Sequence, residues 1–149
     1  MNFLWHIRGS VSLDGSATNE AALDRVERLL ERQRKPIAEL TDNQVTFDAP
    51  LWENHFTPNW YAMVMYDQGR FWIEQDLNGR TLRYDLRSLH GFVFCLFGAA
   101  MFFAFGLAGG GFLDGLKFAS FSFGWLYGMN LVLAFARIPS LIRKALRAA

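Results

Sequence analysis

The chain has a single cysteine, Cys95, which lies within an apolar run. One cysteine excludes an intrachain disulfide and fits no zinc spacing, so we expect a reduced and buried thiol. The three histidines, His6, His55 and His90, stand in separate segments, and no two of them are spaced as ligands of one metal ion. The sequence therefore predicts no metal site and no cofactor.

Motifs for nucleotide binding and for nucleophilic catalysis are also missing. No glycine-rich loop joins an expected strand to an expected helix, and no Gly-x-Ser-x-Gly sequence occurs. Glu53 and His55 form one local pair with acid–base potential, in a segment at 49–59 that has two prolines and no periodicity. Such a pair is more often incidental, so we expect that the protein is not an enzyme and keep these two residues as the catalytic candidates.

A clustered basic surface is missing from the first part of the chain. Residues 1–90 carry ten Lys and Arg against thirteen Asp and Glu, a net charge of −3, whereas residues 91–149 carry five against one, a net charge of +4. Binding to nucleic acid needs a basic footprint, so we expect no nucleic-acid partner.

Charge is absent from two long stretches, residues 88–113 and 118–136, of 26 and 19 residues. A helix needs about 20 apolar residues to cross the hydrocarbon core of a bilayer. The alternative is a buried hairpin of a soluble protein, but a domain this small has little room to cover two apolar helices. We therefore expect a transmembrane hairpin at 89–137, with spans at about 90–111 and 117–136.

The basic residues that flank these runs predict an orientation. Cations precede the first run and follow the second, whereas the glycine-rich loop at 109–117 has only Lys117, offset by Asp114. By the positive-inside rule both termini are then cytoplasmic, in agreement with a first segment that does not read as a signal peptide. The cations expected at the membrane surface are Arg83, Arg87, Arg137, Arg143, Lys144 and Arg147.

Small residues recur every four positions in both runs, and in lipid such stripes let helix backbones approach closely. Glycine and alanine are also common in membrane helices generally, which is the alternative explanation. We expect the stripes to pack the hairpin and to leave a face for a partner, and Asn130 is a candidate for a hydrogen bond between helices. The stripes are Ala100, Ala104, Ala108, Ser120, Gly124 and Gly128.

Residues 138–149 form a basic amphipathic tail. Pro139 predicts a break, Ser140 is able to cap a short helix after it, and Ile138 and Leu146 belong to an apolar side opposite the cations. The pattern suits an interfacial helix on an anionic inner leaflet; a plain positive-inside anchor that frays is the alternative.

The first 88 residues predict an α+β domain. Period-two alternation at 3–13 indicates a strand, and a helix capped by Thr18 or Asn19 should end before Pro36. Two hairpins are expected, from 37–40 with 45–48 and from 70–75 with 81–86, while 60–66 is ambiguous between strand and helix. The fold class is thus β-α-β-β-β-β, a small antiparallel sheet with one helix, followed by the two-helix hairpin.

Three functions remain open. The first is an accessory, scaffold or regulatory protein whose partners are the bilayer and another membrane protein or copies of itself. The second is a sensor of a small molecule or lipid at the inner leaflet, with Trp52, Trp60, Tyr61 and Trp72 available as an interfacial belt unless they pack in the core. The third is a membrane enzyme that uses Glu53 and His55. The plan resembles that of many small bacterial membrane proteins, so we expect the bacterial inner membrane as the location.

Overall fold

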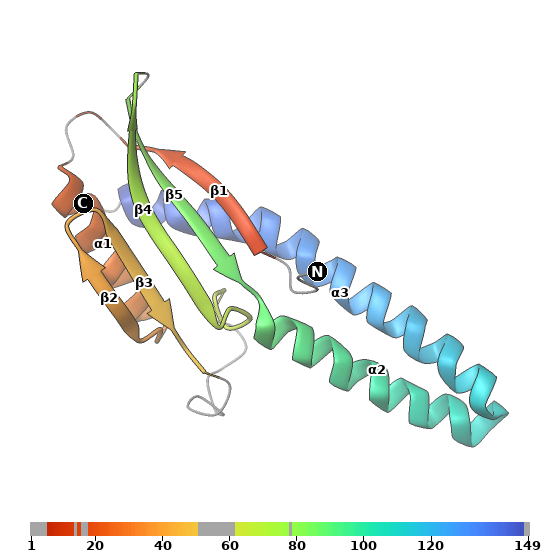
Figure 1. The fold of residues 1–149 in the computed structure, drawn as a ribbon. Helices are drawn as coiled ribbons and strands as arrows, with labels where there is room; N and C mark the ends of the chain where they lie inside the picture. Colours follow the sequence, from red (N-terminus) through yellow and green to blue (C-terminus); the bar gives the residue numbers. More distant parts are fainter. Residues whose placement is uncertain (1–5, 14, 16–17, 51–61, 78, 148–149) are drawn as a thin grey trace.

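The computed structural model describes residues 6–13, 15, 18–50, 62–77 and 79–147 of the 149-residue chain. Its element order is strand, helix, four strands and two long helices, which confirms the expected sheet domain with one helix ahead of two apolar helices (Figure 1). The elements are β1 (His6–Ser12), α1 (Asn19–Arg32), β2 (Ile37–Thr41), β3 (Gln44–Asp48), β4 (Gln68–Asp76), β5 (Gly79–Arg87), α2 (Leu89–Gly110) and α3 (Phe112–Arg147).

The five strands form one antiparallel sheet in the order β1-β5-β4-β3-β2. Both expected hairpins are present, and in the second Asp76 pairs with Gly79, whose φ of 123° is open to glycine at little cost. The first strand, β1, pairs with the last, β5, with Ile7 opposite Leu86, and forms one edge of the sheet. The described end of the ambiguous segment, 62–65, is a turn and adds no strand.

Helix α1 begins as its sequence predicts. The Thr18 side chain accepts a hydrogen bond from the backbone N–H of Ala21 at 3.2 Å and so caps the first turn. The helix ends at Arg32, four residues before Pro36, and turns through Arg34 at a φ of 54°. Its buried side places Leu23, Val26 and Leu30 against the sheet.

Helix α3 does not break at Pro139, and the break predicted there is wrong. One helix of 36 residues runs through the proline to Arg147. Proline in a helix interior costs about 3 kcal/mol, but burial of one large aliphatic side chain returns about 2 kcal/mol. Three such side chains, Ile138, Ile142 and Leu146, lie in the core of the sheet domain, so packing outweighs the lost hydrogen bond.

The core therefore lies between one face of the sheet and two helices, α1 and the last turns of α3. Figure 1 shows the end of α3 beside α1 and behind the sheet. The apolar side of the tail is buried there and does not form the expected surface on the inner leaflet. Its fully buried neighbours in the sheet include Ile7, Phe71, Leu82 and Leu86.

Helices α2 and α3 form a hairpin that extends away from the sheet (Figure 1). The connection is Gly111, at a φ of 91°, so the turn is shorter than the loop expected at 109–117. Among the described residues, both helices are long and apolar enough to cross a membrane. Their large apolar side chains are mostly exposed, as at Phe97, Phe105 and Phe121.

Candidate functional site

The interface inside the hairpin is made where glycines allow the two backbones to meet. A Cβ added at Gly106 would lie 2.7 Å from the Cα of Gly115, and one added at Gly98 would lie 2.7 Å from a methyl carbon of Leu126. Further along, the Asn130 side chain donates a hydrogen bond to the Cys95 Sγ at 3.6 Å. The expected interhelical contact of Asn130 and the expected burial of Cys95, which forms no disulfide, are both confirmed.

The small-residue stripes face away from this interface. A Cβ added at Gly124 or at Gly128 would meet no atom within 4 Å. The hairpin is instead packed by Gly98, Gly106 and Gly115, so the expectation that the stripes join α2 to α3 is wrong. Their contact with a second molecule stays a prediction. Five stripe residues are exposed and Gly128 is half-buried, the five being Ala100, Ala104, Ala108, Ser120 and Gly124.

A buried carboxylate ties the sheet domain to the start of α2. Asp67 is 2 % exposed, it pairs with Arg87 at the end of β5, and its Oδ1 accepts the backbone N–H of Leu89 at 2.9 Å. Burial by itself raises the pKa of Asp67, but the hydrogen bonds from Arg87 and Leu89 outweigh it and lower the pKa from its ordinary 3.8. The same pair raises the pKa of Arg87. Asp67 is therefore charged whenever the domain is folded near neutral pH.

A second set of bonds joins the turn at 62–67 to the same junction. The backbone oxygen of Met65 accepts from the Ser88 hydroxyl and from the backbone N–H of Gly91, both at 3.1 Å. Lys35, which is 7 % exposed, donates to the backbone oxygen of Tyr66 at 2.6 Å. Burial lowers the pKa of Lys35 to about 8, against the attraction of Asp67, which raises it. The turn, β5 and α2 are thus fixed to one another by polar contacts within a buried region.

The cations expected at a membrane surface divide into three groups. Arg83 pairs with Glu74 on the neighbouring strand and Arg87 pairs with Asp67, so both are engaged within the domain. Arg137 is exposed on α3 next to the apolar run. Arg143, Lys144 and Arg147 lie at the end of α3 farthest from the hairpin, beside α1 (Figure 1). The structure thus places these last three beside the sheet domain and not at the hairpin.

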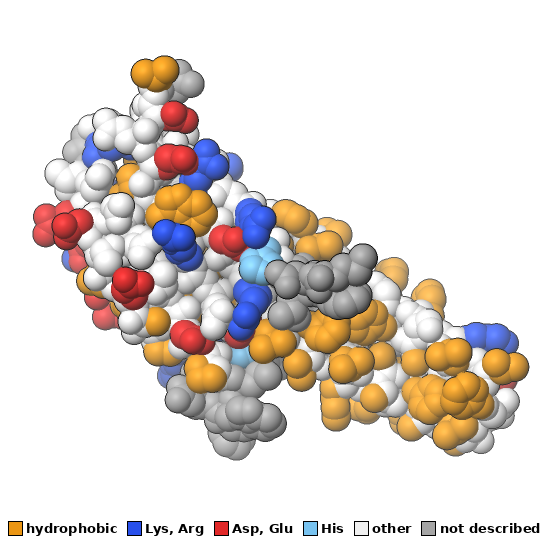
Figure 2. Space-filling view, viewed as in Figure 1, with side chains coloured by type: hydrophobic (Ala, Val, Ile, Leu, Met, Phe, Trp, Pro, Cys, Tyr) orange, Lys and Arg blue, Asp and Glu red, His pale blue; other side chains and the backbone are white. Residues whose placement is uncertain are grey.

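The open face of the sheet carries both signs of charge in alternation, whereas apolar side chains gather over the hairpin (Figure 2). Asp85 accepts from His6 at 2.6 Å and from Arg8 at 2.7 Å. The Arg70 guanidinium lies 5.3 Å from the centre of the Trp72 ring and donates to the Gln44 amide oxygen. This face is polar and largely neutralised by its own pairs, so it does not present an unbalanced charge to a ligand. Trp72 lies on it, outside the core.

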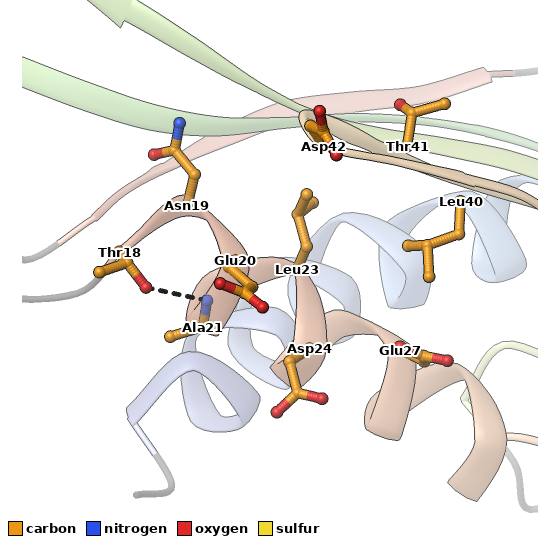
Figure 3. A pocket seen from close by; sticks show the side chains of 10 residues that line it. All are labelled: Thr18, Asn19, Glu20, Ala21, Leu23, Asp24, Glu27, Leu40, Thr41 and Asp42. Atoms are coloured by element: carbon orange, nitrogen blue, oxygen red, sulfur yellow. Dashed lines mark hydrogen bonds between the residues drawn. The ribbon is translucent and has the colours of Figure 1, made fainter.

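A hollow of about 980 Å³ lies between the first turns of α1 and the β2–β3 turn (Figure 3). Leu23 points from the helix toward the turn, whereas the Asp24 carboxylate points away and pairs with Arg28. The carboxylates around it do not converge. Within the described residues no group of three or more potential metal ligands is found.

The two catalytic candidates, Glu53 and His55, lie outside the described residues, as do Trp52, Trp60 and Tyr61. Sequence reasoning missed Asp67, Lys35 and Ser88, which are brought together at the junction. Their one sequence signal is the placement of polar residues beside the apolar stretches 62–66 and 89–110, because a buried polar group needs a partner.

Comparison with known proteins finds no matching family model, no matching curated protein and no matching solved structure, so any function has to be argued from this chain's own residues.

Proposed function

We propose that the chain is an integral membrane accessory, scaffold or regulatory protein that acts through contacts between helices and between domains. The observation that carries this proposal is the continuity of α3. Its first part exposes apolar side chains such as Phe121 and Val132, and its last turns place Ile138 and Ile142 in the core of the sheet domain. A domain built around the end of a membrane helix keeps a fixed height and orientation at the bilayer.

In this proposal both helices of the hairpin span the bacterial inner membrane. The turn at Gly111 lies outside, and the sheet domain and both termini lie in the cytoplasm. Exposure of apolar side chains over both helices supports the spans, because such a surface is costly in water. The excess of cations at the domain end of the hairpin supports the orientation.

The partner in the membrane is another helical protein or a second copy of this chain. The stripe around Gly124 and Gly128 supports this, because it is left open by the hairpin and admits a close backbone approach. Between residues 91 and 136 the charged residues are Asp114 and Lys117, at the turn, and the large side chains exposed on both helices are apolar, which suits helix packing better than a water-filled pore.

A sensor at the inner leaflet is the second candidate, and the junction favours it. Met65 accepts hydrogen bonds from both Ser88 and Gly91, so a change in the preceding loop would be felt at the first turn of α2. In this form the protein would regulate a partner in response to a ligand. The two proposals share the same hairpin and differ in the role of the loop.

Cysteine labelling tests the placement. Leu77→Cys in the sheet domain and Gly109→Cys near the hairpin turn, each in a Cys95→Ser background, are treated with an impermeant thiol reagent in intact cells and in inverted membrane vesicles. Both positions are exposed. We expect Gly109→Cys to react only from outside and Leu77→Cys only from the cytoplasmic side. Reaction of both from one side would contradict the spanning hairpin.

Paired variants test the class of function. If the chain is an accessory protein, His55→Ala should leave the phenotype of the cells unchanged. Gly124→Leu with Gly128→Leu should instead weaken association with the partner, measured by cross-linking, by about 1 kcal/mol or more. Met129→Leu, on the same helix and exposed, is the control. Loss of the phenotype in correctly inserted His55→Ala protein, with the glycine variants unaffected, would favour an enzyme.

A further inference from the structure

Strand β1 is at the edge of the sheet, with one neighbour, β5, within the described part of the chain. The bond from the N–H of Leu13 to the oxygen of Arg80 continues the β1–β5 register, in which Val11 pairs with Leu82. In an antiparallel pair alternate residues exchange both backbone bonds with the partner strand. The backbone groups of the residues between, Ser10 and Ser12, therefore point outward from the sheet, where an added strand would bind them.

A groove of about 320 Å³ runs along this edge. Ser10 and Ser12 form one side of it, and the other side includes Arg25 of α1 and Arg143 and Arg147 of α3. A second hollow, of about 470 Å³, shares Arg143 and Arg147 with this groove and is also lined by Lys144. None of the described residues that line either hollow is acidic.

The cations of this groove are not neutralised within the described structure. The Arg25 side chain donates to the backbone oxygen of Leu146, a neutral acceptor, and Arg143 and Arg147 are exposed. On the open sheet face Arg8, Arg83 and Arg87 each pair with a carboxylate, and Arg70 alone among the arginines named there donates to a neutral acceptor, the Gln44 amide oxygen. Among the described residues, the edge of β1 thus combines backbone groups that no strand pairs with a positive charge that no carboxylate compensates.

We propose that β1 and this groove bind an extended acidic segment of a partner protein, which adds a strand to the sheet and places carboxylates against Arg143 and Arg147. Side chains of an added strand alternate between the two faces, so every second residue would face the arginines. The inference rests on the proposed function, because it names the docking segment of the partner. A second copy at this edge would bring its own arginines, so charge complementarity favours an acidic partner.

The position of the groove argues against lipid headgroups as the occupant. Arg147 lies ten residues beyond Arg137, the first cation after the apolar run. At 1.5 Å per residue this places Arg147 about 15 Å farther from the bilayer along α3. A cytoplasmic protein segment reaches this edge, whereas a headgroup in the plane of Arg137 does not.

Peptide binding to the full-length chain in phosphatidylcholine nanodiscs tests the inference. The probe is a fluorescein-labelled peptide with the repeat Glu-Val-Glu-Val-Glu-Val, and its matched control has Gln in place of Glu. We expect the Glu peptide to bind and the Gln peptide not to bind. The double variant Arg143→Ala, Arg147→Ala should weaken the affinity for the Glu peptide at least about tenfold. Arg32→Ala with Lys117→Ala removes the same charge from other exposed sites and should change the affinity less than about twofold.

Ser10→Pro separates strand addition from simple attraction of anions. It removes an outward N–H, leaves the ladder to β5 intact, and should weaken the Glu peptide about tenfold or more. Unchanged peptide affinity in Ser10→Pro protein with a native melting temperature would overturn the strand-addition model. Loss of peptide binding on adding phosphatidylglycerol to the nanodiscs, in wild-type protein, would show that headgroups occupy the groove and would also overturn it.

Two further measurements complete the test. A monomer–dimer equilibrium abolished by Ser10→Pro would assign β1 to contact between copies and contradict the acidic partner. Carbonate extraction of membranes tests the proposed function by itself. If the chain is extracted by carbonate and still binds the peptide, only the membrane proposal is contradicted. If the chain stays in the membrane and does not bind the peptide, only this inference is contradicted.

Discussion

The Asp67 carboxylate accepts the backbone N–H of Leu89 at 2.9 Å, so a residue placed before β4 caps the helix that follows β5. Ser88, the residue at the cap position itself, makes no side-chain bond of that kind and donates instead to Met65. The N–H groups of the first turn of a helix have no partner within the helix and need other acceptors. Supplying one from another strand of the sheet fixes the direction in which α2 leaves the domain.

Asp67→Ala should therefore destabilise the folded chain. It removes the cap on Leu89 and leaves the Arg87 guanidinium without its carboxylate, so we expect the free energy of unfolding to fall by about 2 kcal/mol. The measurement is thermal or denaturant unfolding of the full-length protein in micelles. Asp67→Asn, which keeps an oxygen for Leu89, should cost less.

The exposed Asp48, which accepts a bond from Gln68, provides the control for Asp67. Asp48→Ala should cost under about 0.5 kcal/mol. The pKa of Asp67 is depressed in the folded state, so its contribution is complete above 3.8 and is lost as the pH falls through the lower folded value. Equal losses in Asp67→Ala and Asp48→Ala would show that the junction is not held by this carboxylate.

Because of Lys35, the free energy of unfolding should increase with pH above about 8. The pKa of Lys35 is about 8 in the folded chain and 10.5 in the unfolded chain, so between these values the unfolded chain binds more protons and stability increases with pH. Above about 10 the raised pKa values of Tyr66 and Tyr84 act in the opposite direction. The melting temperature should accordingly rise from pH 8 toward 10.

Lys35→Met should remove this rise, because the buried amine is then replaced by an apolar side chain of similar length. The exposed Lys117 is the matched control, and Lys117→Met should leave the pH profile unchanged. A rise that survives in Lys35→Met protein would assign the effect to another group. Failure of both variants to differ from wild type at any pH would contradict the burial of Lys35.

Local patterns predicted most of the fold, and contacts between distant segments decided the rest. Alternation and turn residues gave the strands and both hairpins, and uncharged length gave α2 and most of α3. The stripe formed by Ile138, Ile142 and Leu146 suits a lipid interface and a sheet face equally, so sequence alone had no means of choosing between them. Pro139 predicted a break because proline disfavours a helix interior. The packing that offsets this cost comes from the sheet, which is distant in sequence.

The candidate site was less predictable for the same reason. Asp67 and Leu89 are separated by a whole hairpin, and no spacing rule connects them. The small-residue stripes were identified from four-residue periodicity. The role of each glycine, however, depends on which residue of the other helix lies opposite it, and periodicity does not give that residue. Gly106 meets Gly115, whereas Gly124 meets nothing within the chain, although both lie in apolar helices.

The end of α3 should be required for the sheet domain to fold. Ile142 is 1 % exposed, so Ile142→Ala should lower the free energy of unfolding by about 3 kcal/mol. Ser140→Ala, at an exposed position two residues earlier, should change it by less than about 0.5 kcal/mol. The measurement is unfolding of the full-length chain in micelles, followed by near-ultraviolet circular dichroism. A fully native signal after truncation at residue 137 would contradict this role.

Gly106→Ala tests the close approach of the two hairpin helices. The added Cβ would lie 2.7 Å from the Cα of Gly115 and 2.9 Å from the backbone oxygen of Asp114, and backbone atoms there cannot rotate aside. The helices must separate, so we expect a loss of about 1–3 kcal/mol in stability against sodium dodecyl sulfate in mixed micelles. Gly124→Ala, whose Cβ meets nothing within 4 Å, is the control and should not destabilise the monomer, because Ala favours a helix more than Gly does. If Gly106→Ala is as stable as Gly124→Ala, the backbones of α2 and α3 do not meet at Gly106 and Gly115. If Gly124→Ala alone is destabilising, the stripe around Gly124 is the surface that another helix covers.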